Sequence, residues 1–109
     1  MTDDATAGLD AVLHPPARLQ IAAVLARVDE AEFARLRSIT GVSDSVLSKH
    51  LAALAEAGHV SLRKGASGGR QRTWVSITRA GRNAFRRHMA AIEALISAAT
   101  AYSRKTSGD

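Results

Sequence analysis

The sequence predicts a single, mainly α-helical domain with one small β-hairpin, an α+β fold. Residues 43–58 repeat leucine at helical spacing, at Leu47, Leu51 and Leu54. After Gly58 the period changes, and apolar residues alternate with polar ones on both sides of a glycine-rich stretch, as in a hairpin. The length of 109 residues suits one domain, and a content of 46% hydrophobic and 23% charged residues is typical of a soluble globular protein.

Two helical segments open the chain. Residues 4–13, DATAGLDAVL, form a short helical pattern that ends before HPP. Two prolines interrupt a helix but suit the start of the next one, so a second helix is expected over residues 16–28. Its expected buried stripe consists of Leu19, Ala22, Leu25 and Val28.

Two further helices follow as a pair. The first is expected to begin at Asp29, with Glu32 three residues on as in a capping box, and to end at Gly41. The second is expected to begin at the N-cap Ser43 and to end at Gly58. Because only TGV separates them, the pair is predicted to form a helix-turn-helix.

A hairpin and a long helix complete the predicted fold. HVSLRKG (residues 59–65) and RTWVSIT (residues 72–78) show strand-like alternation, and the glycines of GASGGRQ supply the turn between them. Thr78 is expected to cap a final helix over residues 79–105.

The charge of the chain is unevenly distributed. The formal net charge is +5, but residues 1–56 carry 5 basic and 8 acidic groups, whereas residues 57–109 carry 10 basic and 2 acidic groups. No acid lies between Ala57 and Ile92. A basic block of this kind is typical of a protein that binds nucleic acid. The alternative is a solvated basic face that keeps an alanine-rich chain in solution.

The order of the elements is that of a winged helix-turn-helix. The stretches LSKHLAALAEAGHV and GGRQRTWVSITRAGRNAF resemble the winged-helix transcriptional regulators related to the MarR and ArsR families, in particular their short stand-alone DNA-binding members. The resemblance covers roughly residues 9–90, with Ile77 where leucine is usual. It implies a regulator of transcription, more often a repressor than an activator. The matching residues are Leu47, Ser48, His50, Leu51, Leu54, Gly58, Val60, Arg72, Thr73, Thr78, Gly81, Arg82, Ala84 and Phe85.

The second helix of the helix-turn-helix has a slender face opposite its leucines. Lys49 lies almost opposite them, with Ser45 and Ala52 beside it. A major groove about 12 Å wide admits a helix whose facing side chains are short or reach for a base or phosphate. An ordinary exposed face of an alanine-rich helix is the alternative. The residues predicted to contact DNA are Ser43, Asp44, Ser45, Val46, Ser48, Lys49 and Ala52.

Asp44 fits this interpretation least well, because a carboxylate repels phosphates. It either stabilises the first turn of the helix through the helix dipole or accepts a hydrogen bond from a cytosine amino group, and we favour the first role.

The hairpin, here called the wing, is the second predicted DNA element. Its glycines allow a tight turn close to a sugar-phosphate backbone. Arg70 and Arg72 are expected to enter the minor groove, and Arg63 and Lys64 to contact phosphates. A merely flexible hairpin is the alternative. Trp74 is expected to pack at the base of the wing.

The last helix is longer than one small domain needs. From Phe85 its apolar residues follow heptad spacing and run past the core, which suggests association with a second copy of the chain, joined by residues 4–13. A helix folded back over its own domain is the alternative. The predicted dimer interface comprises Leu9, Val12, Leu13, Ile92, Leu95, Ile96, Ala99 and Tyr102.

The sequence shows no pattern of an enzyme, a cofactor site or a metal site. It has no cysteine, no phosphate-binding loop and no triad with supporting motifs. His14, His59 and His88 are dispersed without ligand-like spacing. His50, beside the leucine stripe, is expected to be a partly buried, hydrogen-bonded structural residue.

The expected location is the cytoplasm, because MTDDATAG lacks the order of a signal peptide and no apolar run is of membrane-spanning length. The alternative function is a winged-helix adaptor that binds a protein without specific DNA binding, and the basic block argues against it. RNA is less favoured than duplex DNA, because only 4% of the residues are aromatic. The sequence leaves open whether a small-molecule effector binds.

Overall fold

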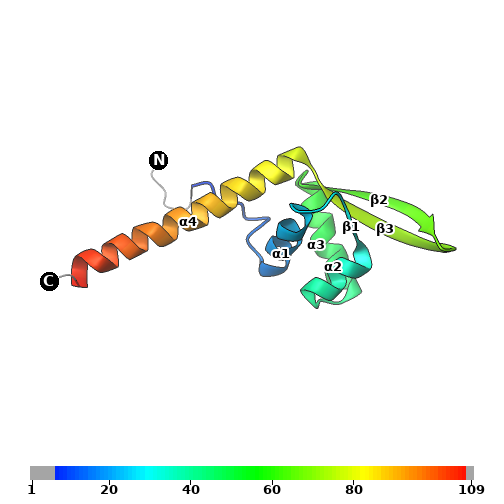
Figure 1. Cartoon of the computed structure of the whole chain (residues 1–109), viewed down its shortest axis with the longest axis horizontal. Coiled ribbons are helices and arrows are strands. Elements are labelled where there is room, and N and C mark those ends of the chain that lie inside the picture. The colour runs from blue at the N-terminus through cyan, green and yellow to red at the C-terminus, as the bar shows by residue number, and fades with distance from the viewer. Residues whose placement is uncertain (1–6, 108–109) are drawn as a thin grey trace.

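Within residues 7–107, which the structure describes, the computed structural model contains four helices and a three-stranded antiparallel sheet (Figure 1). Side chains are described through Arg104. The fold class confirms the prediction. The elements are α1 (Pro16–Leu25), β1 (Ala31–Glu32), α2 (Phe33–Thr40), α3 (Asp44–Glu56), β2 (Val60–Ser67), β3 (Arg70–Ile77) and α4 (Arg79–Ser107), and the strand order is β1-β3-β2.

The core lies between the helix-turn-helix, α1 and the base of the sheet. The leucine stripe of α3 is buried in it as predicted. The stripe predicted for α1 is partly confirmed, because Ala22 and Leu25 are buried. Leu19 is only half-buried and Val28 is 40% exposed, whereas Ile21, which the prediction left out, is fully buried. Because α1 ends at Leu25, Val28 lies beyond the helix. The buried apolar residues are Leu13, Ile21, Ala22, Leu25, Leu36, Leu47, Leu51, Leu54, Val60, Val75 and Ala84.

The capping box predicted at the start of α2 is not formed. Ala31 and Glu32 pair with Val75 and Trp74 of β3 instead, which adds a short edge strand that the sequence did not indicate. Because these two residues are extended, α2 begins only at Phe33, and the side chain of Glu32 makes no cap hydrogen bond.

The other predicted caps of the helix-turn-helix are present. Gly41 ends α2 in the left-handed region, with φ of 74°, which favours glycine. Ser43 Oγ accepts a hydrogen bond from the Val46 backbone N–H at 3.2 Å at the start of α3.

The first helical segment was predicted wrongly. Residues 7–13 form turns rather than a helix, and residues 4–6 lie outside the described residues. Gly8 has a φ of 93°, which interrupts helical geometry. Asp10 Oδ1 accepts hydrogen bonds from the backbone N–H groups of Val12 and Leu13, at 2.9 and 3.3 Å, and so stabilises a tight turn.

The start of α4 is fixed to the start of β2. Thr78 Oγ1 accepts a hydrogen bond from the Gly81 N–H at 2.9 Å, as its predicted capping role requires, and donates one to the Gly58 carbonyl at 2.6 Å. A Cβ at Gly81 would lie 2.0 Å from the His59 carbonyl oxygen, so this position needs glycine. Arg82 Nη1 also donates to the Ala26 carbonyl at 2.8 Å.

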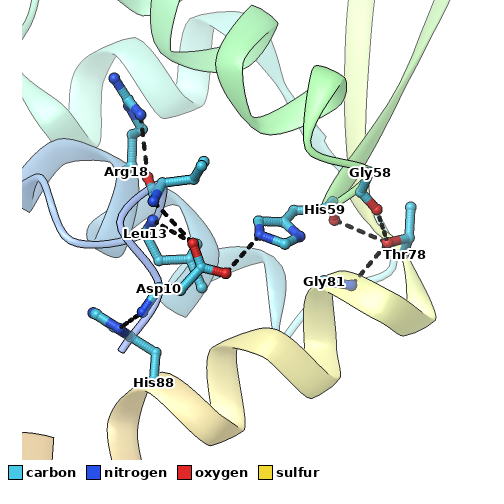
Figure 2. A network of polar contacts seen from close by, with 9 residues as sticks. Asp10, Leu13, Arg18, Gly58, His59, Thr78, Gly81 and His88 are labelled. Atoms are coloured by element: carbon cyan, nitrogen blue, oxygen red, sulfur yellow. Dashed lines mark hydrogen bonds and ion pairs between the residues drawn. The ribbon is translucent and has the colours of Figure 1, made fainter. Parts of the chain in front are cut away.

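A polar cluster fastens the N-terminal segment to α4 and to His59, which directly precedes β2 (Figure 2). The Asp10 N–H donates to His88 Nδ1 at 2.9 Å, and Asp10 Oδ2 accepts from His59 Nε2 at 3.0 Å. His14 contacts the His88 ring edge to face, with centroids 5.7 Å apart. The histidines are therefore not dispersed as predicted, although no group in the described residues has the geometry to hold a metal ion.

His88 is held in its neutral form. Its side chain has no exposed surface, and its Nδ1 must stay unprotonated to accept the Asp10 N–H. Burial lowers the pKa of His88, and His14 lowers it further, whereas Asp10 opposes them. Since an unfolded histidine titrates at about 6.5, the unfolded chain binds more protons below that pH and the free energy of unfolding falls.

We therefore predict that the protein loses stability as the pH falls from 7.5 to 5.5, and that His88→Asn weakens this dependence. The Asn amide oxygen can replace Nδ1 as an acceptor but does not titrate, while the smaller side chain costs about 1–3 kcal/mol at pH 7.5. Urea unfolding at several pH values measures both effects. Part of the dependence remains in the variant, because burial and Arg18 also lower the pKa of His50. An unchanged pH dependence would contradict this role of His88.

Candidate nucleic-acid interface

The slender face of α3 is open to solvent. The leucines on the opposite side are at most 3% exposed, which fixes the rotation of the helix about its axis. All of the residues predicted to contact DNA from this helix are exposed in the described structure: Ser43, Asp44, Ser45, Val46, Ser48, Lys49 and Ala52. His50 is half-buried, and its Nδ1 accepts a hydrogen bond from Arg18 Nε at 3.0 Å, which fits the predicted structural role.

Asp44 is part of an ion pair that the sequence did not indicate. Its Oδ1 lies 2.7 Å from Nη1 of Arg37 on α2, so the pair crosses the turn of the helix-turn-helix. The side-chain cap of α3 is supplied by Ser43 rather than by Asp44. Asp44 is therefore bound to a neighbouring cation within its own chain.

The strand register separates the basic residues of the wing onto two faces. Lys64 pairs with Thr73 and shares its face with the buried Val75, because side chains alternate along a strand. Arg63 pairs with Trp74 and lies on the other face, where its guanidinium carbon is 5.1 Å from the centroid of the Trp74 ring. Trp74 is half-buried at the base of the wing, as predicted.

Two wing arginines are bound to acids of the same chain. Arg63 Nη2 donates to Glu30 Oε1 at 2.6 Å, and Arg63 Nε lies 3.4 Å from the other carboxylate oxygen. Arg72 Nη1 donates to Glu32, and Arg72 Nε to the Ser67 carbonyl at 3.4 Å. Although no acid lies within the basic block, two of its arginines are therefore paired with acids from the segment before α2.

A groove with a volume of about 380 Å³ lies between the start of α2 and the outer half of β3. β1 pairs only with Trp74 and Val75, which leaves the edge of β3 beyond them unpaired. The groove therefore connects the helix-turn-helix to the wing. Its lining combines three cations with one acid: Glu32, Phe33, Ala34, Arg37, Arg70, Gln71, Arg72 and Thr73.

Three predicted DNA-contacting cations are exposed and form no ion pair within the described part of the chain: Lys49 on α3, and Lys64 and Arg70 on the wing. Sequence reasoning missed Arg37, Glu30 and Glu32, which complete the charge pattern around them. The partners of these residues lie 7 to 40 positions away, so no local pattern identifies them.

The distal half of α4 projects away from the domain (Figure 1) and gives the chain a length of 67 Å. It does not fold back over the core, so that alternative was wrong. Ile96 and Tyr102 are 60% and 70% exposed. Of the other predicted interface residues, Ala99 is exposed, whereas Leu9, Val12, Ile92 and Leu95 are half-buried.

Leu13 was assigned wrongly to the dimer interface, because it is 1% exposed and belongs to the core of its own chain. The turn that Asp10 stabilises directs the Leu13 side chain inward.

None of the helices within residues 7–107 combines the length and apolar character that a membrane span requires.

Comparison with known proteins identifies the family. The family model described as a winged helix DNA-binding domain matches residues 17–96, which include the helix-turn-helix, the wing and the first half of α4. No curated protein matched the sequence.

Several solved structures share this fold, two of them named as transcriptional regulators. A transcriptional regulator homologue from Pyrococcus horikoshii OT3 is 28% identical, with a TM-score of 0.74 over 80% of this chain and 86% of that one. A MarR-family transcriptional regulator from Silicibacter pomeroyi is 27% identical, with a TM-score of 0.60 over 78% of this chain and 56% of that one. HlyU from Vibrio cholerae is 25% identical, with a TM-score of 0.57 over 69% and 77%. The chain belongs to the winged-helix DNA-binding domain family and is related to the MarR-type transcriptional regulators.

Proposed function

We propose that the protein is a cytoplasmic homodimer that binds a specific duplex DNA sequence and represses transcription by occupying a promoter. The observation that carries the proposal is the slender, solvent-exposed face of α3. Short side chains around Lys49 allow the helix to enter a major groove, where Lys49 can reach a guanine or a phosphate. The serines and Ala52 then lie against base edges.

The wing supplies the flanking contacts in this proposal. Arg70, beside the tip, enters the minor groove, and Lys64 neutralises a phosphate of the backbone. Arg63 stacks on Trp74 and is bound to Glu30, so we assign it first to bracing the wing.

The proposed dimer forms through the distal half of α4 and the segment around Leu9. Ile96 and Tyr102 provide exposed apolar surface that a second α4 can cover. Leu9, Pro15 and Pro16 line a neighbouring hollow of about 580 Å³ that can receive part of the partner. A two-fold dimer would place two α3 helices on half-sites about 34–36 Å apart, which suits a palindromic operator.

Substitutions at Lys49 and Arg70 can distinguish contacts that supply sequence-specific affinity from contacts that supply affinity for any duplex. Lys49→Ala should weaken binding to an operator selected from random duplexes by about 1–3 kcal/mol and binding to other duplexes much less. Arg70→Ala should weaken binding to all duplexes and reduce the slope of log affinity against log salt by about 0.9. Fluorescence anisotropy at several salt concentrations measures both.

Arg87→Ala is the matched control, because Arg87 is an exposed cation on α4 away from the wing. It should leave operator affinity within about twofold of the wild type, as distant surface substitutions usually do. If Lys49→Ala and Arg70→Ala behave like this control, the assigned contacts are wrong. If the wild-type protein binds no duplex, the adaptor function replaces the present proposal.

The dimer is tested by placing a charge on the exposed stripe of α4. Ile96→Glu should convert the dimer to a monomer, because an unpaired carboxylate would be buried between two apolar helices. Ala94→Glu adds the same charge on the opposite side of α4 and should leave the dimer intact. Sedimentation equilibrium measures the molecular mass, and circular dichroism confirms folding. A wild-type monomer, or a dimer that tolerates Ile96→Glu, contradicts the proposed interface.

A further inference from the structure

The groove between α2 and β3 has the composition of an anion site, and two of its three arginines are paired with acids of the same chain. Arg37, Arg70 and Arg72 line it. Arg37 is paired with Asp44, and Arg72 with Glu32, which leaves Arg70 without an ion pair among the described residues. The three arginines and their two acidic partners together carry a net positive charge. The arginines already lie around one groove.

The two internal acids are held differently. The pair of Arg37 and Asp44 is exposed, at 45% and 67% of the two side chains. Exposed pairs of this kind are weak, because water screens them and both side chains lose freedom. Asp44 can also leave Arg37 without loss of the α3 cap, because Ser43 supplies that cap.

Glu32 is fixed more firmly. Its backbone is paired with Trp74 in the sheet, and its side chain and that of Arg72 are both about one-third exposed. Arg72 is held from a second side by the Ser67 carbonyl. Glu32 therefore acts as a support that keeps the Arg72 guanidinium at the groove.

We propose that this groove binds a backbone phosphate of DNA, and that the phosphate replaces Asp44 at Arg37 while Glu32 keeps Arg72 in place. The inference rests on the proposed function and deepens it. This groove of the protein lies between α2 and the wing. In the proposed complex, a DNA strand would pass there between the major groove that holds α3 and the minor groove that holds the wing tip. Arginine suits this exchange, because its planar guanidinium binds carboxylates and phosphates with the same geometry. Asp44 is then an internal competitor that lowers affinity for every duplex.

The exchange predicts different effects on duplex affinity for two substitutions that remove the same charge. Asp44→Asn should raise duplex affinity by about two- to fivefold, the strength of an exposed ion pair. Glu32→Gln should not raise affinity, because Arg72 loses its support. Glu56→Gln, at the far end of α3, is the control for net charge and should change affinity less than twofold. Anisotropy titrations on the selected operator and on an unrelated duplex measure all three.

A double-mutant cycle distinguishes exchange from simple repulsion between Asp44 and DNA. Arg37→Ala should lower affinity and reduce the salt slope by about 0.9. In that background Asp44→Asn should have no effect, because the arginine for which Asp44 competes is gone. Circular dichroism and thermal unfolding check that each variant is folded.

Several outcomes would overturn the exchange. These are an equal gain from Asp44→Asn in both backgrounds, no gain in either, or a gain from Glu32→Gln as large as that from Asp44→Asn. A loss confined to the selected operator would show instead that Asp44 contacts a base. Failure of the proposed function is distinguishable, because the wild-type protein would then bind neither duplex.

Discussion

The enclosure of the leucine stripe of α3 is the constraint on which the rest of the structure depends. Leu47 and Leu54 are fully buried, and Leu51 is 3% exposed. Each buried leucine contributes about 1.5–3 kcal/mol relative to an exposed one, so a rotation of the helix that exposed all three would cost much of the stability of a small domain. The helix therefore has one orientation, and its opposite face must meet solvent or a partner. The small side chains there leave room for a partner to approach closely.

The contacts at the start of α4 connect this face to the rest of the chain. Thr78 and Gly81 fix α4 against the start of β2, and Asp10 joins the N-terminal segment to both elements. These contacts lie close to the base of the wing (Figure 2). In a dimer built on α4, they would also set the distance between the two copies of α3. In the proposed dimer, the angle of α4 would therefore influence the spacing of the half-sites.

Local patterns predicted the parts of the fold that local physics determines. The leucine period gave α3, the alternation around the glycines gave the wing, and Ser43 and Thr78 capped the helices that follow them. β1 escaped notice because a two-residue strand exists only through its pairing with β3, more than 40 positions away.

Long-range polar contacts account for the other errors. The N-terminal segment, whose turns Asp10 stabilises locally, is held in place by contacts of Asp10 with His59 and His88, at separations of 49 and 78 residues. The charge of the wing was misjudged for the same reason, since its acids precede α2. The exposed face of α3 could be predicted because its position follows from the leucines alone.

The insertion of α3 into a major groove can be tested directly by site-specific crosslinking. Because the chain contains no cysteine, a cysteine introduced at Ser45 can be labelled uniquely with a photoactivatable group. Sequencing the crosslinked strands of the selected operator then locates the group on the DNA. We predict crosslinks to bases within each half-site, and none above background from the same label at Ala94 on α4. Equal crosslinking from both positions, or crosslinks outside the half-sites, would contradict the insertion of α3.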